Sequence, residues 1–465
     1  MNEFECPLSL NSRKNPHKVA LISKEKTLTY QKSHELTSLM YLNLNYVGIK
    51  EGEKVAIYPH IEWITPLIFF SLFRLKAVVC PLNIRLPLLA LSMQLSELQA
   101  SYLLCPDSFK TLPSTSIKSL FFSELIKPSR NSISDMFLDK NQVSTFLYTS
   151  GTAGKPKIAI HSLGNHYYSA LGSNAYLPFT DKDRWLLSLP LFHVGGIGIL
   201  FRSFLKGAAV VLPDQKRPLI NSIIQYAVSH LSCVPTQVYR LLKEDALTLR
   251  KATSSLRCIL LGGGPISLSL LKEGIQAGLS LFPTYGMTEM SSQITTQLNS
   301  SPLNISLGHP LPYRMLKIAP NGEILVKGKT LFQGYLNPSH EGERQTDPQG
   351  WFSTKDLGSY SLKRGLTIQG RKDRLFISGG ENIQPEEIEN ILLECKTIIT
   401  AHVCPIQDQE FGLKPIAYIQ TKDSYSKEML FEYLSSFLPK FKIPVDFLPL
   451  SEMPVSPQKK DSLLS

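Results

Sequence analysis

Hydrophobic and polar residues follow one another along the first third of the chain in a pattern that predicts strands separated by helices. Strands are expected at Lys18–Ile22, Lys54–Tyr58 and Ala77–Cys80, where short apolar runs stand between polar segments. A helix is expected over Tyr30–Tyr46, and Trp63–Lys76 is apolar on most faces, which indicates a buried helix. Strands alternating with helices predict a multi-layered α/β fold with mainly parallel sheets.

The pattern changes at three places further along. Residues 108–141 are polar and weakly patterned, as is typical of a connection. From Arg314 onward, short strands separated by turn residues predict a small β subdomain. The charged turn Arg371–Arg374 precedes a compact α+β unit. We therefore expect an N-terminal domain over residues 1–370 and a small C-terminal domain over residues 371–465.

Composition narrows the classes of function. A chain of 465 residues exceeds what one core usually supports, which agrees with more than one domain. The net charge of +11 is spread along the chain without long basic runs, so we expect small anionic ligands and no nucleic acid. Seven widely separated cysteines without metal-ligand spacing predict free thiols in a reducing compartment.

The sequence also indicates the cellular compartment of the protein. The N-terminus lacks the form of a signal peptide, and the most apolar window, Ile64–Phe73, is too short to span a bilayer. A cytoplasmic protein without a membrane span is expected. The oligomeric state is left open, and a homo-oligomer is compatible with the sequence.

The stretch Tyr148–Lys157 is the first candidate for chemistry. Its residues 149–157 lie between two strand-like runs and contain two glycines, three hydroxyl residues and two lysines. Glycine lets backbone N–H groups approach a phosphate closely, and lysine supplies the opposite charge. Proline follows Lys155, and the spacing of the glycines differs from a Walker A loop. A solvated turn is the alternative, but the length and setting of the loop favour a phosphate site.

Three further stretches contain side chains suited to a nucleotide. An apolar strand before Phe282 runs into a turn expected to present the ring of Tyr285 and the carboxylate of Glu289, which suit a base and Mg²⁺. Asp356 is expected in a loop before a strand, where a carboxylate can bind a ribose diol and a solvated turn is the alternative. The stretch Gly370–Glu389 joins the two expected domains and ends in a helix with proline in its first turn.

In this order and spacing, the four stretches resemble the adenylate-forming superfamily of acyl-CoA synthetases, peptide-synthetase adenylation domains and luciferases. The resemblance covers nearly the whole chain. It implies the adenylate-forming enzyme fold with a mobile C-terminal domain, and a reaction in two steps. A carboxylate attacks the α-phosphate of ATP to give an acyl-adenylate and pyrophosphate, and a thiol then takes the acyl group. The implied cofactors are ATP and Mg²⁺, with CoA as co-substrate.

The resemblance also implies roles for individual residues. The loop that closes over the β- and γ-phosphates is matched by Thr149, Ser150, Gly151, Thr152, Gly154 and Lys157. The nucleoside contacts are matched by Gly262, Gly263, Gly264 and Pro265 beside the adenine, by Tyr285 as the stacking ring, and by Asp356 with its partner Arg371 at the ribose. Thr288 matches a phosphate contact, Glu289 the magnesium ligand and Asp373 the hinge. The loop that lines the pantetheine tunnel is matched by Ser378, Gly379 and Gly380.

The catalytic lysine of the family corresponds to Lys460, which lies six positions after Pro454. Its implied role is to neutralise charge developing on the α-phosphate and on the attacking carboxylate. Lys459 replaces the usual glycine, so either lysine could serve, and a solvated tail is the alternative. A second departure is Lys355, which stands where the family has glycine before the ribose aspartate.

Within the superfamily, the chain is most similar to the o-succinylbenzoate–CoA ligases of menaquinone biosynthesis. The segments that carry this closer likeness are Gly164–Gly172, Leu189–Gly196, Leu261–Pro265, Thr284–Ile294 and Ile377–Ile383. The likeness implies an aromatic dicarboxylate as the substrate, so one carboxylate must be held while the other reacts.

Candidate residues for holding this second carboxylate follow from their chemistry. Arg202, on a helix expected over Ile197–Leu205, is the candidate cation, and a surface cation is the alternative reading of it. His193 would gate or line the pocket, unless it is a satisfied core histidine. Additional hydrogen bonds are expected from Ser291, Ser292 and Gln293.

Two other functions stay open on sequence alone. A ligase for another aryl or medium-chain acid would share every ATP-binding residue, and substrate screening would distinguish it. A non-catalytic nucleotide-binding relative is supported by the changed tail and by Lys355. The presence of Lys157, Glu289, Asp356 and Lys460 argues against that second reading.

Overall fold

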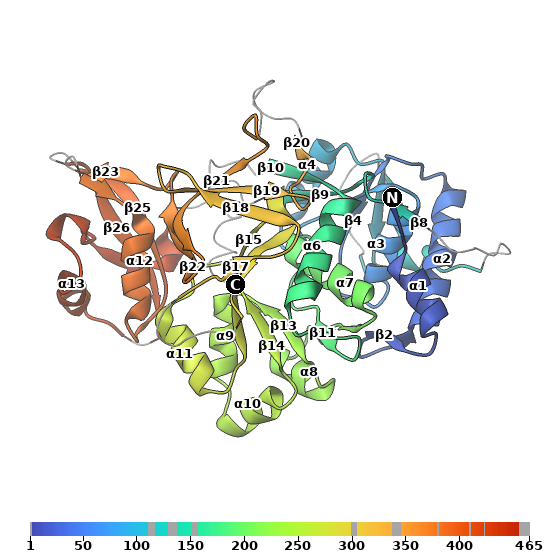
Figure 1. The fold of residues 1–465 in the computed structure, drawn as a ribbon, viewed down its shortest axis with the longest axis horizontal. Coiled ribbons are helices and arrows are strands. Elements are labelled where there is room, and N and C mark those ends of the chain that lie inside the picture. Colours follow the sequence, from blue (N-terminus) through green and yellow to red (C-terminus); the bar gives the residue numbers. More distant parts are fainter. Residues whose placement is uncertain are drawn as a thin grey trace.

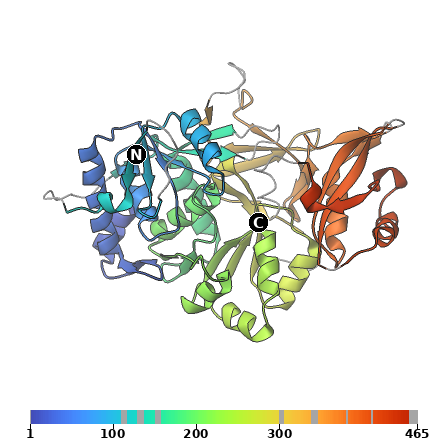
Figure 2. The same cartoon turned by 180° about the vertical axis from the view of Figure 1, so that it is seen from behind.

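The computed structural model describes residues 2–109, 117–128, 137–149, 157–298, 305–336, 346–378, 381–408, 411–422 and 424–454. Two large sheets with helices between and around them make up most of the molecule (Figure 1). The C-terminal unit, drawn in orange and red, extends to one side of the sheets, as the view from behind also shows (Figure 2). None of the described helices combines the length and hydrophobicity needed to cross a bilayer. All seven cysteines are free thiols.

The first large sheet has a parallel centre and an antiparallel edge. Its seven strands lie in the order β20 (Gly334–Leu336), β10 (Lys157–Ser162), β9 (Val143–Thr149), β5 (Val78–Pro81), β4 (Lys54–Ile57), β6 (Tyr102–Cys105) and β7 (Lys118–Phe121). The pairing of β10 with β20 brings together residues that are more than 170 positions apart in the sequence, such as Ala159 and Tyr335.

The second sheet is likewise parallel at its centre and antiparallel at both edges. Its nine strands lie in the order β17 (His309–Pro310), β16 (Ser292–Thr296), β15 (Leu281–Met287), β14 (Cys258–Leu261), β13 (His230–Cys233), β11 (Arg184–Leu186), β12 (Ala209–Val211), β2 (Val19–Ile22) and β3 (Thr27–Thr29). The expected α/β architecture with mainly parallel sheets is confirmed for the centres of both sheets.

The helices follow from clear sequence signals at their ends. Thr29 caps α2 (Tyr30–Val47) by accepting a hydrogen bond from the N–H of Lys32, and Gly48 ends it with a φ of 101°. The other helices of the sheet layers are α1 (Pro7–Lys14), α3 (Thr65–Arg74), α4 (Leu88–Leu98), α6 (Leu163–Tyr176), α7 (Val194–Lys206), α8 (Leu219–Gln225), α9 (Pro235–Leu242), α10 (Ala246–Thr253) and α11 (Leu268–Gln276).

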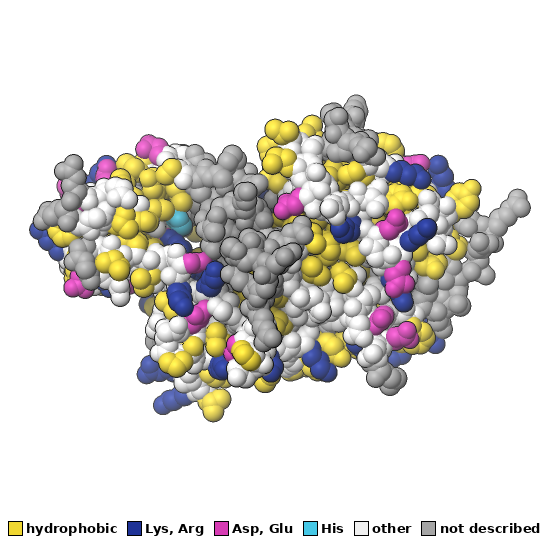
Figure 3. All heavy atoms as spheres, turned by 90° about the horizontal axis from the view of Figure 1, so that it is seen from above, with side chains coloured by type: hydrophobic (Ala, Val, Ile, Leu, Met, Phe, Trp, Pro, Cys, Tyr) yellow, Lys and Arg dark blue, Asp and Glu magenta, His cyan; other side chains and the backbone are white. Residues whose placement is uncertain are grey.

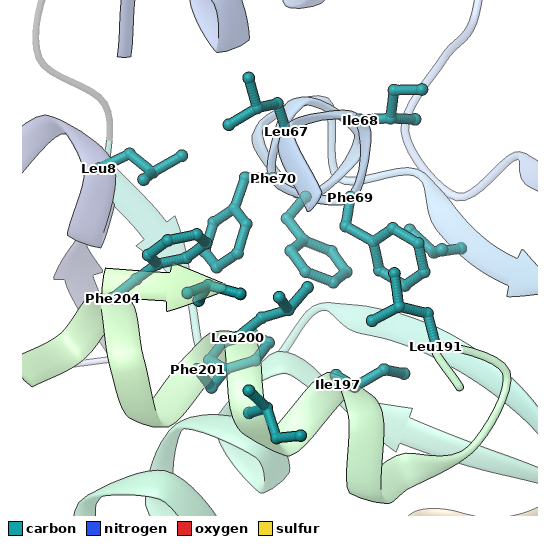
Figure 4. Packing of buried hydrophobic residues seen from close by; sticks show 14 of the residues in the cluster. Leu8, Leu67, Ile68, Phe69, Phe70, Leu191, Ile197, Leu200, Phe201 and Phe204 are labelled. Atoms are coloured by element: carbon teal, nitrogen blue, oxygen red, sulfur yellow. The ribbon is translucent and has the colours of Figure 1, made fainter. Parts of the chain in front are cut away.

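The largest core lies where α3 packs against α7. All ten residues of α3 are buried, as expected for this stretch from its sequence. Figure 4 shows Phe70 of α3 directed toward Phe201 and Phe204 of α7. The ring centres of Phe70 lie 5.5 Å from Phe201 and 5.3 Å from Phe204, in tilted and edge-on arrangements favoured by aromatic pairs. This packing fixes α7, which also carries Arg202 and begins next to His193.

One part of the organisation expected from sequence is wrong. Residues 108–141 were expected to be a plain connection, but they contain β7, the short helix α5 (Phe122–Leu125) and β8 (Phe137–Asp139). The strand β7 is at the edge of its sheet, and Leu120 is its buried residue. A short edge strand with one buried side chain leaves little hydrophobic pattern to detect.

The β subdomain expected after Arg314 is confirmed. It is an antiparallel sheet in the order β18 (Arg314–Ile318), β19 (Glu323–Gly328), β21 (Phe352–Ser361) and β22 (Gly365–Arg371). It lies between the large sheets and the C-terminal unit (Figure 1). The last residue of β22, Arg371, is also the first residue of the charged turn Arg371–Arg374.

The C-terminal unit has a hydrophobic core of its own, which includes Phe376, Ile388, Leu430 and Phe447. Its elements are β23 (Phe376–Ser378), β24 (Glu381–Ile383), α12 (Pro385–Glu394), β25 (Ile398–Asp408), β26 (Gly412–Thr421), α13 (Lys427–Ser435) and β27 (Phe447–Pro449). The domain boundary between residues 370 and 371 stays a prediction.

Charge is dispersed over the surface that Figure 3 displays. On the described side chains of that face, lysine and arginine are interspersed with aspartate and glutamate. Mixed charge of this kind agrees with the even spread of basic residues along the sequence.

Candidate active site

Two neighbouring parallel strands place the expected adenine segment and Tyr285 at the same edge of the second sheet. Gly262 follows β14 directly, and β14 pairs in parallel with β15. A Cβ atom at Gly262 would lie 2.7 Å from the carbonyl oxygen of Thr284, so glycine is required for the two strands to approach here. Gly263, Gly264 and Pro265 are exposed beyond the strand end.

Tyr285 lies within β15 rather than in the turn expected from sequence. The strand continues to Met287 because β15 pairs with β16 up to the register Met287–Ser292. The turn is a single 3-10 turn over Thr288–Met290. The ring is therefore held by the sheet, while Thr288 and Glu289 lie on the turn.

Asp356 connects the ring of Tyr285 to Arg371. The hydroxyl of Tyr285 donates to Asp356 Oδ2 at 2.5 Å, and Arg371 Nη1 donates to Asp356 Oδ1 at 3.1 Å. The expectation of a loop position for Asp356 is wrong, because the residue lies inside β21. Its direct cross-strand partner on β22 is Arg371, which explains how the carboxylate and the guanidinium meet.

Burial dominates the electrostatics of this trio. It raises the pKa of Asp356 above its ordinary value, and hydrogen bonds from Tyr285 and Arg371 oppose that rise. Burial first and the charge of Asp356 second raise the pKa of Tyr285 well above its ordinary value. Tyr285 therefore stays protonated and acts as the donor. Arg371 also donates to the hinge candidate Asp373 through two nitrogens, at 3.0 and 2.8 Å.

Glu289 presents a nearly buried carboxylate, with 8% of the residue exposed. Its Oε1 accepts a hydrogen bond from the hydroxyl of Tyr335 at 2.5 Å, and its backbone carbonyl accepts one from the N–H of Phe332 at 2.8 Å. Among the described residues, no three histidine, cysteine or acidic side chains cluster as a metal cage. Mg²⁺ bridging phosphates uses one or two carboxylates, so a single carboxylate of this kind fits the ion.

The neighbouring Thr288 is fixed through its backbone. His161 of β10 shares a hydrogen bond between its Nε2 and the carbonyl oxygen of Thr288 at 2.7 Å. Burial lowers the pKa of His161 to about 4, so the ring is neutral at neutral pH and Nε2 donates to the carbonyl. The sheet that carries the phosphate-loop candidate is thereby connected to the turn that carries Glu289.

The phosphate-loop candidate is described at its two ends. Thr149 ends β9 and Lys157 begins β10, and the two are direct antiparallel partners. The ammonium of Lys157 lies 4.9 Å from the ring centre of Tyr335, which in turn contacts Glu289. The candidates Ser150, Gly151, Thr152 and Gly154 lie outside the described residues. Lys157 and Glu289 therefore contact the same tyrosine side chain.

Arg202 is a buried guanidinium on α7, so the surface-cation reading is wrong. The residue is 2% exposed and lies over the ring of Trp185 at 4.7 Å. Its Nη1 donates to Gln293 Oε1 at 2.9 Å, and no acidic side chain of the described residues pairs with it. Burial lowers its pKa to about 10. A buried cation without an acidic partner is costly, and an anionic ligand would offset that cost.

A glycine on the same helix lets the Arg202 guanidinium lie close to the backbone of α7. Gly198 lies one turn earlier on α7, and a Cβ atom there would lie 3.3 Å from Arg202 Nη2. The amide nitrogen of Gln293 donates to Thr296 Oγ1 at 2.8 Å, which orients its oxygen toward Arg202. The Oγ of Ser291 is buried without a hydrogen-bond partner among the described residues, and Ser292 follows it with a φ of 97°.

His193 is the N-cap residue of α7, but its side chain makes no capping hydrogen bond. The residue is exposed, yet burial by surrounding protein and the charge of Arg85 lower its pKa to about 4. Because the residue is exposed, the reading of His193 as a core histidine is wrong, and its role in lining the pocket stays a prediction.

The C-terminal candidates are described only in part. Ser378 ends β23 and is buried. Gly379, Gly380 and both tail lysines, Lys459 and Lys460, lie outside the described residues.

Three residues of this region were missed by reasoning from sequence. Tyr335 and His161 contact the Thr288–Glu289 turn, and Arg314 donates to the backbone carbonyl of Gln293 at 2.6 Å. Arg314 is buried, and burial lowers its pKa to about 9. Each reaches the site through a long-range contact, so no local motif marks it.

Comparison with known proteins agrees with this geometry. The model of the family described as AMP-binding enzyme matches residues 8–336. A 2-succinylbenzoate–CoA ligase from Bacillus subtilis is 34% identical over 463 residues, covering 96% of this chain and 94% of that protein. The corresponding ligase from Bacillus cereus strain Q1 is 33% identical over 461 residues, with the same coverage of each chain.

Solved structures of o-succinylbenzoate CoA synthetase from Bacillus subtilis share the fold. The complex with the acyl-adenylate intermediate OSB-AMP has a TM-score of 0.87 at 32% identity, covering 98% of this chain and 96% of that chain. The complex with ATP and a magnesium ion has a TM-score of 0.87 at 32% identity, with both chains covered completely.

Proposed function

Because the chain belongs to the AMP-binding enzyme family, we propose that it is an ATP-dependent ligase that joins 2-succinylbenzoate to coenzyme A through an acyl-adenylate. It is an AMP-forming acid–thiol ligase of menaquinone biosynthesis. The observation that carries the acid assignment is the buried Arg202, which has no acidic partner among the described residues.

The nucleoside of ATP binds at the shared edge of β14 and β15. Asp356 is held between Tyr285 and Arg371, so its carboxylate is oriented to accept hydrogen bonds from the ribose hydroxyls. The exposed backbone of Gly263 and Gly264 lies at the end of the neighbouring strand, open to the adenine. The ring of Tyr285 supplies the stacking surface.

The phosphates lie toward Glu289. The hydroxyl of Thr288 and the ammonium of Lys157 contact phosphate oxygens, together with the loop that begins at Thr149. Glu289 holds Mg²⁺, which when bound offsets negative charge on the phosphates. Lys460 of the tail neutralises the charge that develops as the carboxylate attacks.

The acid binds with its second carboxylate toward Arg202. Gln293 holds the guanidinium in place, and the buried hydroxyl of Ser291 is available for a further hydrogen bond. Ser292 adds a hydroxyl, and His193 lines the pocket wall. Desolvation strengthens the attraction between the guanidinium and the carboxylate, so an acid without the second carboxylate is disfavoured.

The reaction proceeds in two steps, adenylation and transfer to CoA. An oxygen of the free carboxylate attacks the α-phosphorus, and pyrophosphate leaves with the electrons of the broken P–O bond. The C-terminal domain, residues 371–465, then turns about Asp373, and the loop at Ser378, Gly379 and Gly380 lines the path of the thiol. The sulfur of CoA attacks the acyl carbonyl, the thiol proton is released, and AMP leaves.

Pyrophosphate release tests the proposal directly. We expect release with 2-succinylbenzoate, an acyl-CoA product only when CoA is added, and little activity with benzoate or octanoate. Arg202→Lys keeps a charge but loses the planar donor pair, and should raise KM for 2-succinylbenzoate by about tenfold or more with ATP binding unchanged. Release with a different acid would leave the adenylation mechanism and reject the substrate assignment.

The proposal also covers the cellular compartment and the oligomeric state of the enzyme. The free cysteines support a reducing compartment, so we place the enzyme in the cytoplasm. A homo-oligomer remains compatible with it, and sedimentation velocity would establish the number of subunits.

A further inference from the structure

Tyr335 lies between two groups assigned above to the phosphates and the magnesium ion. It belongs to β20, and its hydroxyl donates to Glu289 Oε1 at 2.5 Å. The ammonium of Lys157 lies 4.9 Å from the centre of the Tyr335 ring, within the range of a cation–π contact. One side chain therefore contacts the carboxylate with its polar end and the lysine with its aromatic face.

The register between β10 and β20 accounts for this double contact. Tyr335 is the direct antiparallel partner of Ala159, and Lys157 points to the same face of β10 as Ala159. Diagonal neighbours across such a pair are within reach of aromatic and long side chains. Ala159 presents only a methyl group opposite the ring, which leaves room for the ring to approach Lys157. Phe332 packs edge-on against the ring at 4.8 Å and fixes its orientation.

The carboxylate of Glu289 depends on this one tyrosine. In the part of the chain that the structure describes, the hydroxyl of Tyr335 is the one hydrogen-bond donor to that carboxylate. The bond uses Oε1, and Oε2 accepts no hydrogen bond from a described residue. Glu289 is nearly buried, so without the hydroxyl the carboxylate would keep its desolvation and lose its orientation.

We propose that Tyr335 is a positioning residue for the first half-reaction. Its hydroxyl holds Oε1 of Glu289 so that Oε2 is presented to magnesium, and its ring holds Lys157 beside the phosphates. This inference rests on the proposed function only for ATP and magnesium binding and does not depend on the identity of the acid. Partners that orient a metal ligand typically change metal affinity by about 10- to 100-fold when removed.

Calorimetric titration of ATP at a series of magnesium concentrations, without acid or CoA, tests the inference. Tyr335→Phe removes the hydroxyl and keeps the ring beside Lys157. We expect the magnesium concentration for half-maximal ATP binding to rise about tenfold, while ATP affinity in EDTA is unchanged. Tyr335→Leu removes both contacts, so it should in addition weaken ATP binding in EDTA by a few-fold.

Tyr360→Phe is the matched control. It removes a tyrosine hydroxyl that lies 3.3 Å from His309 Nδ1, away from Glu289, and its magnesium requirement should equal that of the unaltered protein. Melting temperatures without ligand are recorded for every variant. A Tyr335→Phe variant that melts normally and needs more magnesium supports the proposal.

Two results would overturn it: an unchanged magnesium requirement in Tyr335→Phe, or an equal loss of ATP affinity with magnesium and in EDTA. The assignment of 2-succinylbenzoate as the substrate can be rejected without rejecting the role of Tyr335. An unaltered protein that binds ATP with magnesium but releases no pyrophosphate with 2-succinylbenzoate contradicts only the acid. An unaltered protein that binds no ATP contradicts both proposals.

Discussion

Lys355 has a backbone φ of 62°, in the left-handed region that favours glycine. The position is nevertheless fixed from both sides. Its N–H donates to Glu323 Oε1 at 3.2 Å, and its carbonyl accepts a hydrogen bond from the N–H of Lys372 at 2.8 Å. A non-glycine residue in this conformation costs about 1–2 kcal/mol. The departure from glycine noted in the sequence is therefore a local strain next to Asp356.

Replacing Lys355 by glycine should relieve this strain. We expect Lys355→Gly to raise the free energy of unfolding by up to about 1 kcal/mol, because the greater entropy of glycine in the unfolded chain offsets part of the gain. Urea denaturation measures the change. Lys355→Ala is the control, since it removes the charge and keeps the Cβ atom. Equal stabilisation by alanine would assign the effect to charge instead of backbone conformation.

At the scale of the element, Gly262 determines how closely β14 and β15 approach. A Cβ atom would lie 2.7 Å from both the carbonyl oxygen and Cγ2 of Thr284, whose next neighbour is Tyr285. Overpacking of this kind typically costs about 1–3 kcal/mol. We expect Gly262→Ala to destabilise the protein by that amount and to raise KM for ATP more than it lowers kcat.

Gly264 provides the comparison for that experiment. A Cβ atom at Gly264 would lie 3.6 Å from Pro235 Cδ, an ordinary contact, so Gly264→Ala should melt within a degree or two of the unaltered protein. If the two alanine variants lost stability equally, the close approach at Gly262 would not be the cause.

The helices and strands differ in how far sequence patterns could predict them. Helix α2 has strong local periodicity, and it was predicted within a few residues, as were the uniformly apolar helix α3 and the strand β4. The Tyr285 and Glu289 motifs were recognised because their residues are contiguous. Tyr335 was missed because its contact with Glu289 depends on the pairing of β10 with β20, which no local pattern encodes. Arg202 could be proposed from sequence, but its burial depends on long-range contacts with Trp185 of β11 and Gln293 of β16.

At the scale of the whole molecule, the C-terminal unit is attached to the second sheet through α11. Glu394, at the end of α12, accepts hydrogen bonds from the N–H groups of Leu268 and Ser269 at 2.6 and 3.0 Å. A carboxylate at a helix N-terminus satisfies unpaired donors and interacts favourably with the helix dipole. The helix α11 follows the Gly262–Pro265 segment closely, so this contact connects the C-terminal unit to the expected adenine site. Figure 1 shows α11 and α12 side by side.

Removing the carboxylate of Glu394 should loosen this attachment without unfolding either side. We expect Glu394→Ala to speed hydrogen exchange at Leu268 and Ser269 about fivefold, the effect of losing a helix cap worth about 1 kcal/mol, and to speed tryptic cleavage at Arg371–Arg374. Exchange mass spectrometry and timed proteolysis measure both effects. Glu387→Ala is the control on the same helix, because Glu387 pairs with Lys442 inside the C-terminal unit at 2.6 Å. If Glu387→Ala matched it, or if Glu394→Ala changed neither rate, the contact would not hold the two units together, and rotation about Asp373 would proceed without having to break it.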